Sequence, residues 1–297
     1  MFWRVLLLVF GVWACSTAAI WIKSIDGDRV HWSLMGAYRL LVAAAILSPL
    51  FFRDLRRYRP RYTARHFARS LVPAVLMAVH FLTWIPGVQL TRAANASLTV
   101  NLTPAVMPFL LYAMMRERLN AGEWVGTAMA VAGVAVLAGA DYHFSPQYFR
   151  GDLICFASMA LFASYLALGR RNRDFPSLWL YLVPLYFVAG LICFAVSLAF
   201  THPLTVGTVT DVACIVGLAV MPTVIGHTIL NQSMKHIGGQ TVSLANLSQF
   251  IFAAVMAYFL LTPPEVPDRP FYVAAGLVVA GAAIAVRYTP SPEPRTR

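Results

Sequence analysis

Polar side chains recur at helical spacing inside long apolar stretches, where few residue types could take part in chemistry. Within residues 95–115, Ser97, Asn101, Pro104 and Pro108 fall at i, i+4, i+7 and i+11, and therefore share one helix face. Each proline removes a backbone donor and frees a carbonyl about one turn earlier. A freed carbonyl beside an Asn amide offers acceptors and donors suited to an ammonium or amide group. The alternative is a proline-kinked packing helix whose Asn bonds to a neighbour.

A second polar stripe lies within residues 240–262, where Ser243, Asn246 and Gln249 also share a helix face. Its motif "NLSQ" resembles the "NLTP" of the first stripe. We predict that the two stripes form two halves of one substrate-binding site. The residues assigned to it from the stripes are Asn101, Pro104, Asn246 and Gln249.

Imidazole and aromatic side chains on other apolar segments extend the predicted site. His80 shares a helix face with Trp84, and His227 shares one with Asn231. Trp and Tyr rings would add stacking or cation–π contacts worth about 0.5–2 kcal/mol each. A packing role stays open for each histidine. We assign substrate binding to His80, Trp84, Tyr165 and Trp13, and gating or coupling to Arg39, Glu117 and His227.

Charged residues are rare inside the apolar segments. Arg39 is the only one well inside, and it could bind a carboxylate, bond to helix carbonyls or extend towards the surface. A structural or gating role is favoured. Glu117 lies between Arg116 and Arg118 and most simply forms an ion pair in a loop, with gating as the alternative. All twelve acids lie at segment ends or in loops, so no carboxylate within the membrane can relay protons or bind sodium.

The segments that position these residues are long enough to cross a bilayer. The chain has 297 residues, 59% of them apolar and 12% charged, with a mean hydropathy of +0.68, whereas soluble domains carry about 25% charged residues. We therefore predict an all-α integral membrane protein with ten transmembrane helices. These cover residues 2–22, 32–52, 70–90, 95–115, 122–140, 152–169, 178–200, 212–234, 240–262 and 270–287.

The basic residues predict the orientation of the chain. With a cytoplasmic amino terminus, most Lys and Arg residues lie on the inside, including the run of arginines between 53 and 69. Both termini are therefore expected in the cytoplasm, and the membrane is expected to be the cell inner (plasma) membrane. Because the bases flank membrane spans, the net charge of +11 does not indicate a nucleic-acid partner.

An internal repeat organises the spans. "AANASLTVNLTP" at 93–104 resembles "GGQTVSLANLSQ" at 238–249 without a gap, and "VAGVAVL" at 131–137 resembles "VAGAAIA" at 279–285. We predict a first five-helix repeat over 1–140 and a second over 141–297. Because five is odd, the second repeat is inverted, which is typical of secondary transporters that bind substrate near the bilayer midplane.

These stretches resemble the drug/metabolite transporter superfamily in its EamA-like branch. The resemblance rests on residues 87–139, on "NQSMKHIGGQTVSLANLSQF" at 231–250 and on "AYRLLVAA" at 37–44, and it covers essentially the whole chain. It implies ten spans in two five-span repeats. Among members of the branch the chain is most similar to the amino-acid exporters, in its aromatic-rich spans. One departure is Gln249, which stands where the first copy has Pro104.

The function expected from repeat and resemblance is a secondary transporter. It would export small neutral or zwitterionic metabolites, amino acids (aromatic ones included) foremost, by alternating access. The runner-up is a broad-specificity exporter of drugs or hydrophobic cations. The sequence contains nothing that resembles the ion filter of a channel. It also lacks the clusters of acids, bases or metal ligands that a membrane enzyme would need. The expected partners of the transporter are a small-molecule substrate and the lipid bilayer. No cofactor, metal or nucleic acid is expected.

Overall fold

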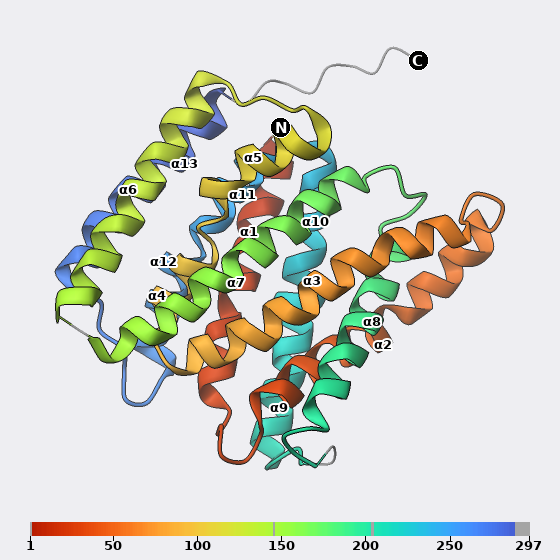
Figure 1. The fold of residues 1–297 in the computed structure, drawn as a ribbon, viewed down its shortest axis with the longest axis horizontal. Coiled ribbons are helices and arrows are strands. Elements are labelled where there is room, and N and C mark those ends of the chain that lie inside the picture. The colour runs from red at the N-terminus through yellow and green to blue at the C-terminus, as the bar shows by residue number, and fades with distance from the viewer. Residues whose placement is uncertain (1, 145, 203–204, 289–297) are drawn as a thin grey trace.

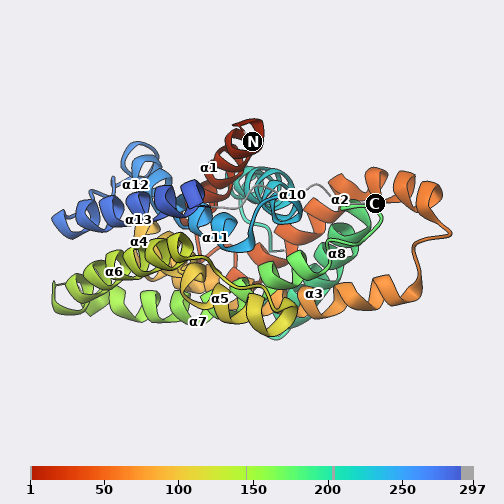
Figure 2. The ribbon, with the colours of Figure 1, turned by 90° about the horizontal axis from the view of Figure 1, so that it is seen from above.

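The computed structural model describes residues 2–144, 146–202 and 205–288, and over these ranges the chain folds into helices without a strand. The helices α6 and α13 lie at one side of the bundle and α2, α3 and α8 at the other (Figures 1 and 2). Between them lie α1, α7, the short helices α4, α5, α11 and α12, and the segment containing α9 and α10. The site is built from this central group.

The helix bounds follow the predicted spans closely. They are α1 (Phe2–Ser24), α2 (Trp32–Tyr58), α3 (Ala64–Gln89), α4 (Ala93–Val100), α5 (Thr103–Met115), α6 (Ala121–Phe144), α7 (Pro146–Arg171), α8 (Trp179–Ser197), α9 (Val209–Leu218), the π-helix η1 (Ala219–His227), α10 (Thr228–His236), α11 (Gly239–Leu247), α12 (Gln249–Leu260) and α13 (Arg269–Tyr288).

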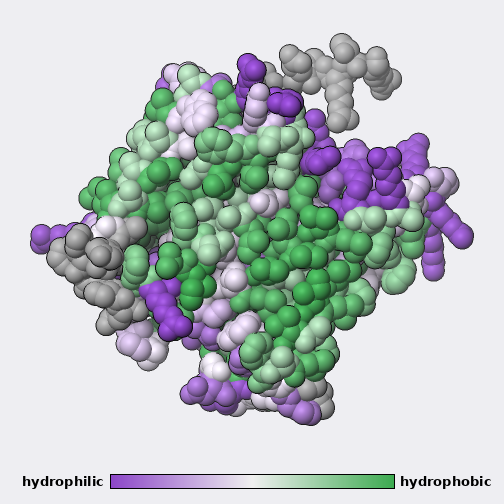
Figure 3. All heavy atoms as spheres, viewed as in Figure 1, coloured by the Kyte–Doolittle hydropathy of each residue, from purple (hydrophilic) through white to green (hydrophobic). Residues whose placement is uncertain are grey.

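Eight helical segments of the described chain are long and apolar enough to cross a bilayer. Two shorter apolar helices, Ala121–Leu137 and Arg269–Ala285, coincide with the fifth and tenth predicted spans. The polytopic, all-helical class is therefore confirmed, while the count of ten spans stays a prediction. In Figure 3 apolar surface covers much of one face, and hydrophilic residues gather where α2 and α3 meet.

The arginine-rich ends of α2 and α3 were expected to be loop, and here the predicted spans are too short. The helix α2 continues to Tyr58, and α3 begins at Ala64. A capping box starts α3: the Thr63 side chain accepts from the third helical backbone N–H, and the His66 ring accepts from the Thr63 N–H at 3.2 Å. The two helices therefore extend past the apolar stretch.

Two predicted spans are broken, within two residues of matching places in the predicted repeat. The fourth divides into α4 and α5 at Asn101 and Leu102, and the ninth divides into α11 and α12 at Ser248. Pro104 lies in the first turn of α5, where its missing N–H leaves no helical bond unmade. The second break forms without a proline. A break of this kind leaves polar groups of the backbone near midspan, as in transporters with discontinuous helices.

Several spans that the sequence repeat makes equivalent also pack against each other. The helix α2 packs on α8 and α6 on α13, while the two pieces of the fourth span pack crosswise on the two pieces of the ninth, α4 on α12 and α5 on α11. This pairing is what a pseudo-two-fold relation would produce. The predicted boundary at 140 and 141 falls in the last turn of α6, and the repeats themselves stay a prediction. Residue 1 and residues 289–297 of the predicted repeats lie outside the described chain.

Small residues allow α6 and α13 to pack at backbone distance. A Cβ atom added at Gly126 would lie 2.4 Å from the Gly281 carbonyl oxygen, and one added at Gly281 would lie 2.5 Å from the Gly126 carbonyl oxygen. Without a hydrophobic driving force between helices in lipid, such close approach is a main source of helix association.

We expect Gly281→Ala to destabilise the protein by about 1–3 kcal/mol, because the new methyl group meets a backbone oxygen that cannot move aside cheaply. Gly276→Ala on the same helix is the matched control, since nothing lies within 4 Å of its added Cβ. Thermal unfolding in detergent should show a lower midpoint for Gly281→Ala alone. Equal midpoints for the two variants would contradict this account of the α6–α13 contact.

Candidate functional site

The two helix breaks meet at the centre of the bundle. Asn246 Nδ2 donates to Asn101 Oδ1 at 2.6 Å, and Gln249 Nε2 donates to Asn246 Oδ1 at 2.5 Å and more weakly to Asn101 Oδ1 at 3.4 Å. Asn101 Nδ2 in turn donates to the Ser97 carbonyl at 2.8 Å, one of the carbonyls left open at the end of α4. All four residues are buried. The structure thus brings together the two polar stripes.

Pro104 occupies a different position from its predicted partners. Its carbonyl accepts from Gln240 Nε2 at 3.0 Å, and the same nitrogen donates to Thr127 Oγ1 at 2.6 Å. The hydroxyls of Thr103 and Ser243 lie 2.5 Å apart beside this contact. Pro104 does not line the central cavity, so its geometry supports joining α5 to α11 rather than touching a substrate.

Arg39 of α2 forms the second polar group of the centre. Its Nε donates to Thr223 Oγ1 at 2.6 Å, and its Nη2 lies 3.5 Å from His227 Nε2. The guanidinium carbon lies 4.1 Å from the centre of the Phe81 ring, a cation–π contact. With 1% of its surface exposed, Arg39 does not extend towards the membrane surface, which removes one of the three predicted alternatives.

The π-helix η1 positions Thr223 and His227, the two hydrogen-bond partners of Arg39. In η1 the Thr223 hydroxyl donates to the Leu218 carbonyl, five residues earlier, at 3.1 Å. Because its proton is used there, the Thr223 oxygen is free to accept from Arg39. His227 follows one turn later and contacts the rings of Phe81 and Phe162, with centroids 6.1 and 5.7 Å away. Single π-helical turns often occur at functional sites.

His80 of α3 is held by α7. The Ser158 hydroxyl donates to the His80 carbonyl at 2.9 Å and lies 2.8 Å from His80 Nδ1. The imidazole ring stacks on Trp84 at 5.8 Å and on Phe162 at 5.0 Å between centroids. His80, Trp84 and Phe162 therefore form one aromatic wall, as expected from the shared face of the first two.

Tyr165 packs beside the aromatic wall without lining the cavity. Its hydroxyl accepts from Asn231 Nδ2 at 2.5 Å, and its ring contacts His227 at 6.1 Å between centroids. Tyr165 itself does not line the central cavity. Trp13 stacks on Phe10, with ring centroids 5.6 Å apart, and it does not line the central cavity either. The structure thus does not support direct substrate contact for either residue in this conformation.

A small central cavity joins the amide group to the arginine group. Its volume is about 20 Å³, and it is lined by Cys15, Ala18, Arg39, His80, Phe81, Trp84, Val100, Asn101, Phe162, His227 and Gln249. Such a volume holds about one water molecule. A metabolite would therefore enter this place only after helices move apart.

Several residues of this centre were not predicted. Thr223 follows Pro222 in a segment where a π turn shifts the helical phase, so a 3.6-residue period would not place it facing Arg39. Phe81 is adjacent to His80 and was not expected on the same side. Phe162 precedes Tyr165 by three residues, and that spacing could have identified it.

Ion pairs close the bundle on the predicted cytoplasmic side. Glu117 pairs with Arg170 of α7, with Oε2–Nε and Oε1–Nη2 distances of 2.8 Å. Arg170 Nη1 also donates to the carbonyls of Met234 and Ile237 at 2.9 Å, which ties α7 to the end of α10. Nearby, Arg69 pairs with Asp174, and its guanidinium lowers the pKa of that carboxyl group from its usual value.

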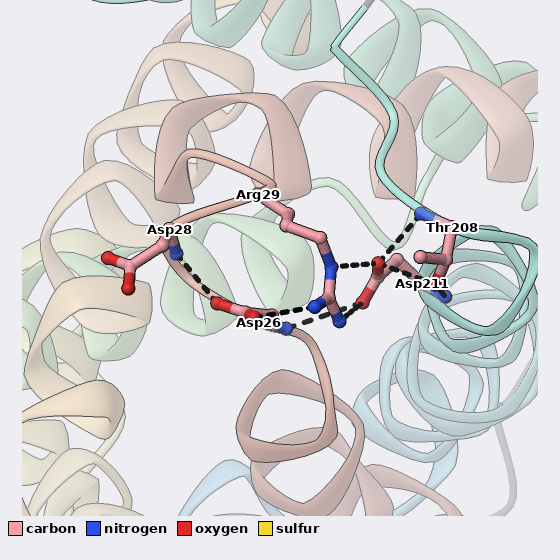
Figure 4. Close-up of polar contacts among 5 residues, drawn as sticks. All are labelled: Asp26, Asp28, Arg29, Thr208 and Asp211. Atoms are coloured by element: carbon pink, nitrogen blue, oxygen red, sulfur yellow. Dashed lines mark hydrogen bonds and ion pairs between the residues drawn. The ribbon is translucent and has the colours of Figure 1, made fainter.

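A second network closes the opposite end, where the loop after α1 meets the start of α9 (Figures 1 and 4). Thr208 is the N-cap of α9, and Asp211 accepts from its backbone N–H and hydroxyl, each at 2.8 Å, in a capping box. Arg29 Nε donates to the same carboxylate at 3.0 Å, and Arg29 Nη1 pairs with Asp26 Oδ2 at 2.7 Å. Ion pairs thus join separate segments of the chain at both ends of the bundle.

Comparison with known proteins gives the family. Residues 2–139 and 149–287 each match the sequence model of the EamA-like transporter family. The chain belongs to this family. That family places it among the membrane transporters of the drug/metabolite transporter superfamily. In the part of the chain that the structure describes, no three His, Cys, Asp or Glu residues gather as a metal site.

Similar proteins include three WAT1-related proteins of Arabidopsis thaliana. One is 32% identical over 157 residues, which is 52% of this chain and 42% of that protein. Another is 23% identical over 238 residues, 70% of this chain and 64% of that protein. The chain thus covers less than two thirds of either relative. A crystal structure matches with a TM-score of 0.74 at 18% identity, over 96% of this chain and 97% of that one, and shows the fold alone.

The double variant Asn101→Ala, Gln249→Ala should lower transport at least tenfold, because it removes both amide side chains that line the cavity. The matched control is Ser164→Ala on α7, whose hydroxyl faces outward and bonds only its own helix at 2.8 Å. Gel filtration in detergent should show both variants folded. Wild-type transport rates in the double variant would mean that these amides serve packing alone.

Proposed function

We propose that the protein is a secondary transporter that exports small neutral or zwitterionic metabolites, amino acids foremost, by alternating access. The single observation that carries this proposal is the central cavity, where the two helix breaks meet and amide, imidazole, guanidinium and aromatic groups share one lining. A carrier needs such a site near midspan, reachable from each side in turn.

The chemistry of the lining supports amino acids over the runner-up. A zwitterion offers an anionic group, a donor group and, in many amino acids, an apolar side chain. The lining offers the cation Arg39, the acceptor oxygens of Asn101 and Gln249, and the rings of Trp84 and Phe162. A hydrophobic cation would meet Arg39 at short range, with no acidic side chain in the lining to offset the repulsion. Export of drugs or hydrophobic cations is therefore less well supported.

Alternating access follows from the two closed ends. Opening towards one side requires the Glu117–Arg170 pair to separate, and opening towards the other requires the Arg29–Asp211 pair to separate. In this role Glu117 is a gating residue, as is Arg170. The Arg29 and Glu117 side chains are partly exposed, so water can replace some of the contacts that these two residues lose.

The orientation proposed for the chain places both termini in the cytoplasm of a cell whose inner (plasma) membrane holds the protein. The support for this is the arginine-rich turn between α2 and α3, since such turns stay on the cytoplasmic side. With this orientation the Glu117–Arg170 pair closes the cytoplasmic side, and the Arg29–Asp211 pair closes the outer side. The proposed partners are the substrate and the bilayer.

Uptake by purified protein in liposomes tests the proposal. Liposomes loaded with an unlabelled amino acid should accumulate the same labelled amino acid by counterflow, for at least one member of a panel of all twenty. No carboxylate within the membrane is expected to couple transport to protons. The assay is therefore run with and without a pH gradient to test for such coupling. Protein-free liposomes are the control. If no amino acid is carried above that control, the proposal fails.

A further inference from the structure

Arg39 is a buried cation without an acidic partner. The described residues form seven ion pairs, and Arg39 takes part in none of them. Only 1% of its surface is exposed. A buried charge in a bilayer protein is costly unless it is paired or faces a cavity that holds a counter-charge. The arrangement therefore requires an explanation beyond packing.

The groups that hold Arg39 are all neutral. Thr223 accepts from its Nε, and the ring of Phe81 lies beneath the guanidinium. Its Nη2 can only donate, so His227 Nε2 must accept, which defines the ring as the neutral tautomer with its proton on Nδ1. These contacts orient the guanidinium without neutralising its charge.

Hydrogen-bond donors remain unused around the same cavity. Arg39 Nη1, Trp84 Nε1 and His227 Nδ1 are buried and have no hydrogen-bond partner. All three residues line the central cavity. A buried donor left unpaired is costly, so three of them at one cavity, beside an uncompensated positive charge, mark a place for an acceptor that carries negative charge.

We propose that these donors form a subsite for the carboxylate group of the transported molecule, and that a free carboxylate defines the substrate class. This inference rests on the proposed function and extends it. A carboxylate presents two oxygens and about four lone pairs, and it forms paired hydrogen bonds with a guanidinium group. The single positive charge matches one carboxylate, whereas a phosphate dianion would exceed it.

The rest of the lining fits the remainder of such a molecule. Trp84 and Phe162 offer an apolar wall next to the arginine, and the amides of Asn101 and Gln249 lie beyond it on the same cavity. An amino group could bond to the amide oxygens, but the carboxylate carries the main interaction. The subsite therefore predicts that carboxylic acids lacking the amino group also bind, whereas amines and amides of the same shape do not.

Four phenyl compounds separate these groups: L-phenylalanine, 3-phenylpropionate, L-phenylalanine amide and phenethylamine. We measure counterflow of each through the full-length protein in liposomes, with thermal shift of the detergent-solubilised protein as a second readout. The two acids should be carried, with half-saturating concentrations at least tenfold lower than those of the amide and the amine. Equal values for acids and amide would overturn the carboxylate subsite, while amino-acid transport would stand.

Variants assign the discrimination to its residues. Arg39→Gln should abolish the preference for acids, and Arg39→Lys should retain part of it, because the charge stays while the paired geometry is lost. If Arg39→Gln fails to fold, Trp84→Phe serves as the second variant, because it keeps the aromatic wall and removes one hydrogen-bond donor. Trp84→Phe should weaken the binding of acids without changing the binding of amides. The control is Trp124→Phe, on the exposed face of α6. An unchanged acid preference in Trp84→Phe and Arg39→Lys would overturn the subsite.

If none of the four compounds, and no amino acid of the larger panel, is carried above protein-free liposomes, the proposed function fails and the subsite with it. Transport of amino acids together with their amides at equal rates is the separate result that removes the subsite alone.

Discussion

The central constraint in this protein is an arginine buried in the bundle without a counter-charge. Arg39 is oriented by a hydroxyl, an imidazole and an aromatic ring, and these come from two further segments of the chain, η1 and α3. Thr223 and His227, which both contact the guanidinium, lie in the π-helix η1. The surrounding helices must exclude lipid from it and leave one of its nitrogens open to the cavity. Substrate chemistry and fold are thus linked through one side chain.

The predicted repeat accounts for the second half of the site, but the two halves are not chemically alike. Asn101 and Asn246 occupy equivalent places and bond to each other across the centre. Next to them, the first half has Pro104, whose carbonyl bonds to Gln240, and the second has Gln249, whose amide reaches the cavity. One break therefore joins two helices, and the other presents a hydrogen-bonding group. A symmetric architecture with unequal side chains can bind an asymmetric molecule in one orientation.

Much of this could be predicted from sequence, for identifiable reasons. Hydropathy predicts the helices, and the aligned motifs predict one site for Asn101, Asn246 and Gln249, whose side chains bond to one another in the structure. The partner of Arg39 could not be predicted, because Thr223 is far away in the chain and lies in a turn that departs from the usual helical period. Trp13 does not line the cavity, and hydropathy could not reveal this because it does not say which face of an apolar helix turns inward. The helix ends at Tyr58 and Ala64 depend on capping rather than hydropathy.

The most direct test of the account is an experimental structure of the protein in lipid nanodiscs with L-phenylalanine bound. We expect the ligand in an enlarged central cavity, with its carboxylate within hydrogen-bond distance, about 3 Å, of the Arg39 guanidinium. Its ring should lie against Trp84 and Phe162, and one of the two end networks should be open. A ligand bound elsewhere, or one in the cavity with its carboxylate turned away from Arg39, would contradict the account.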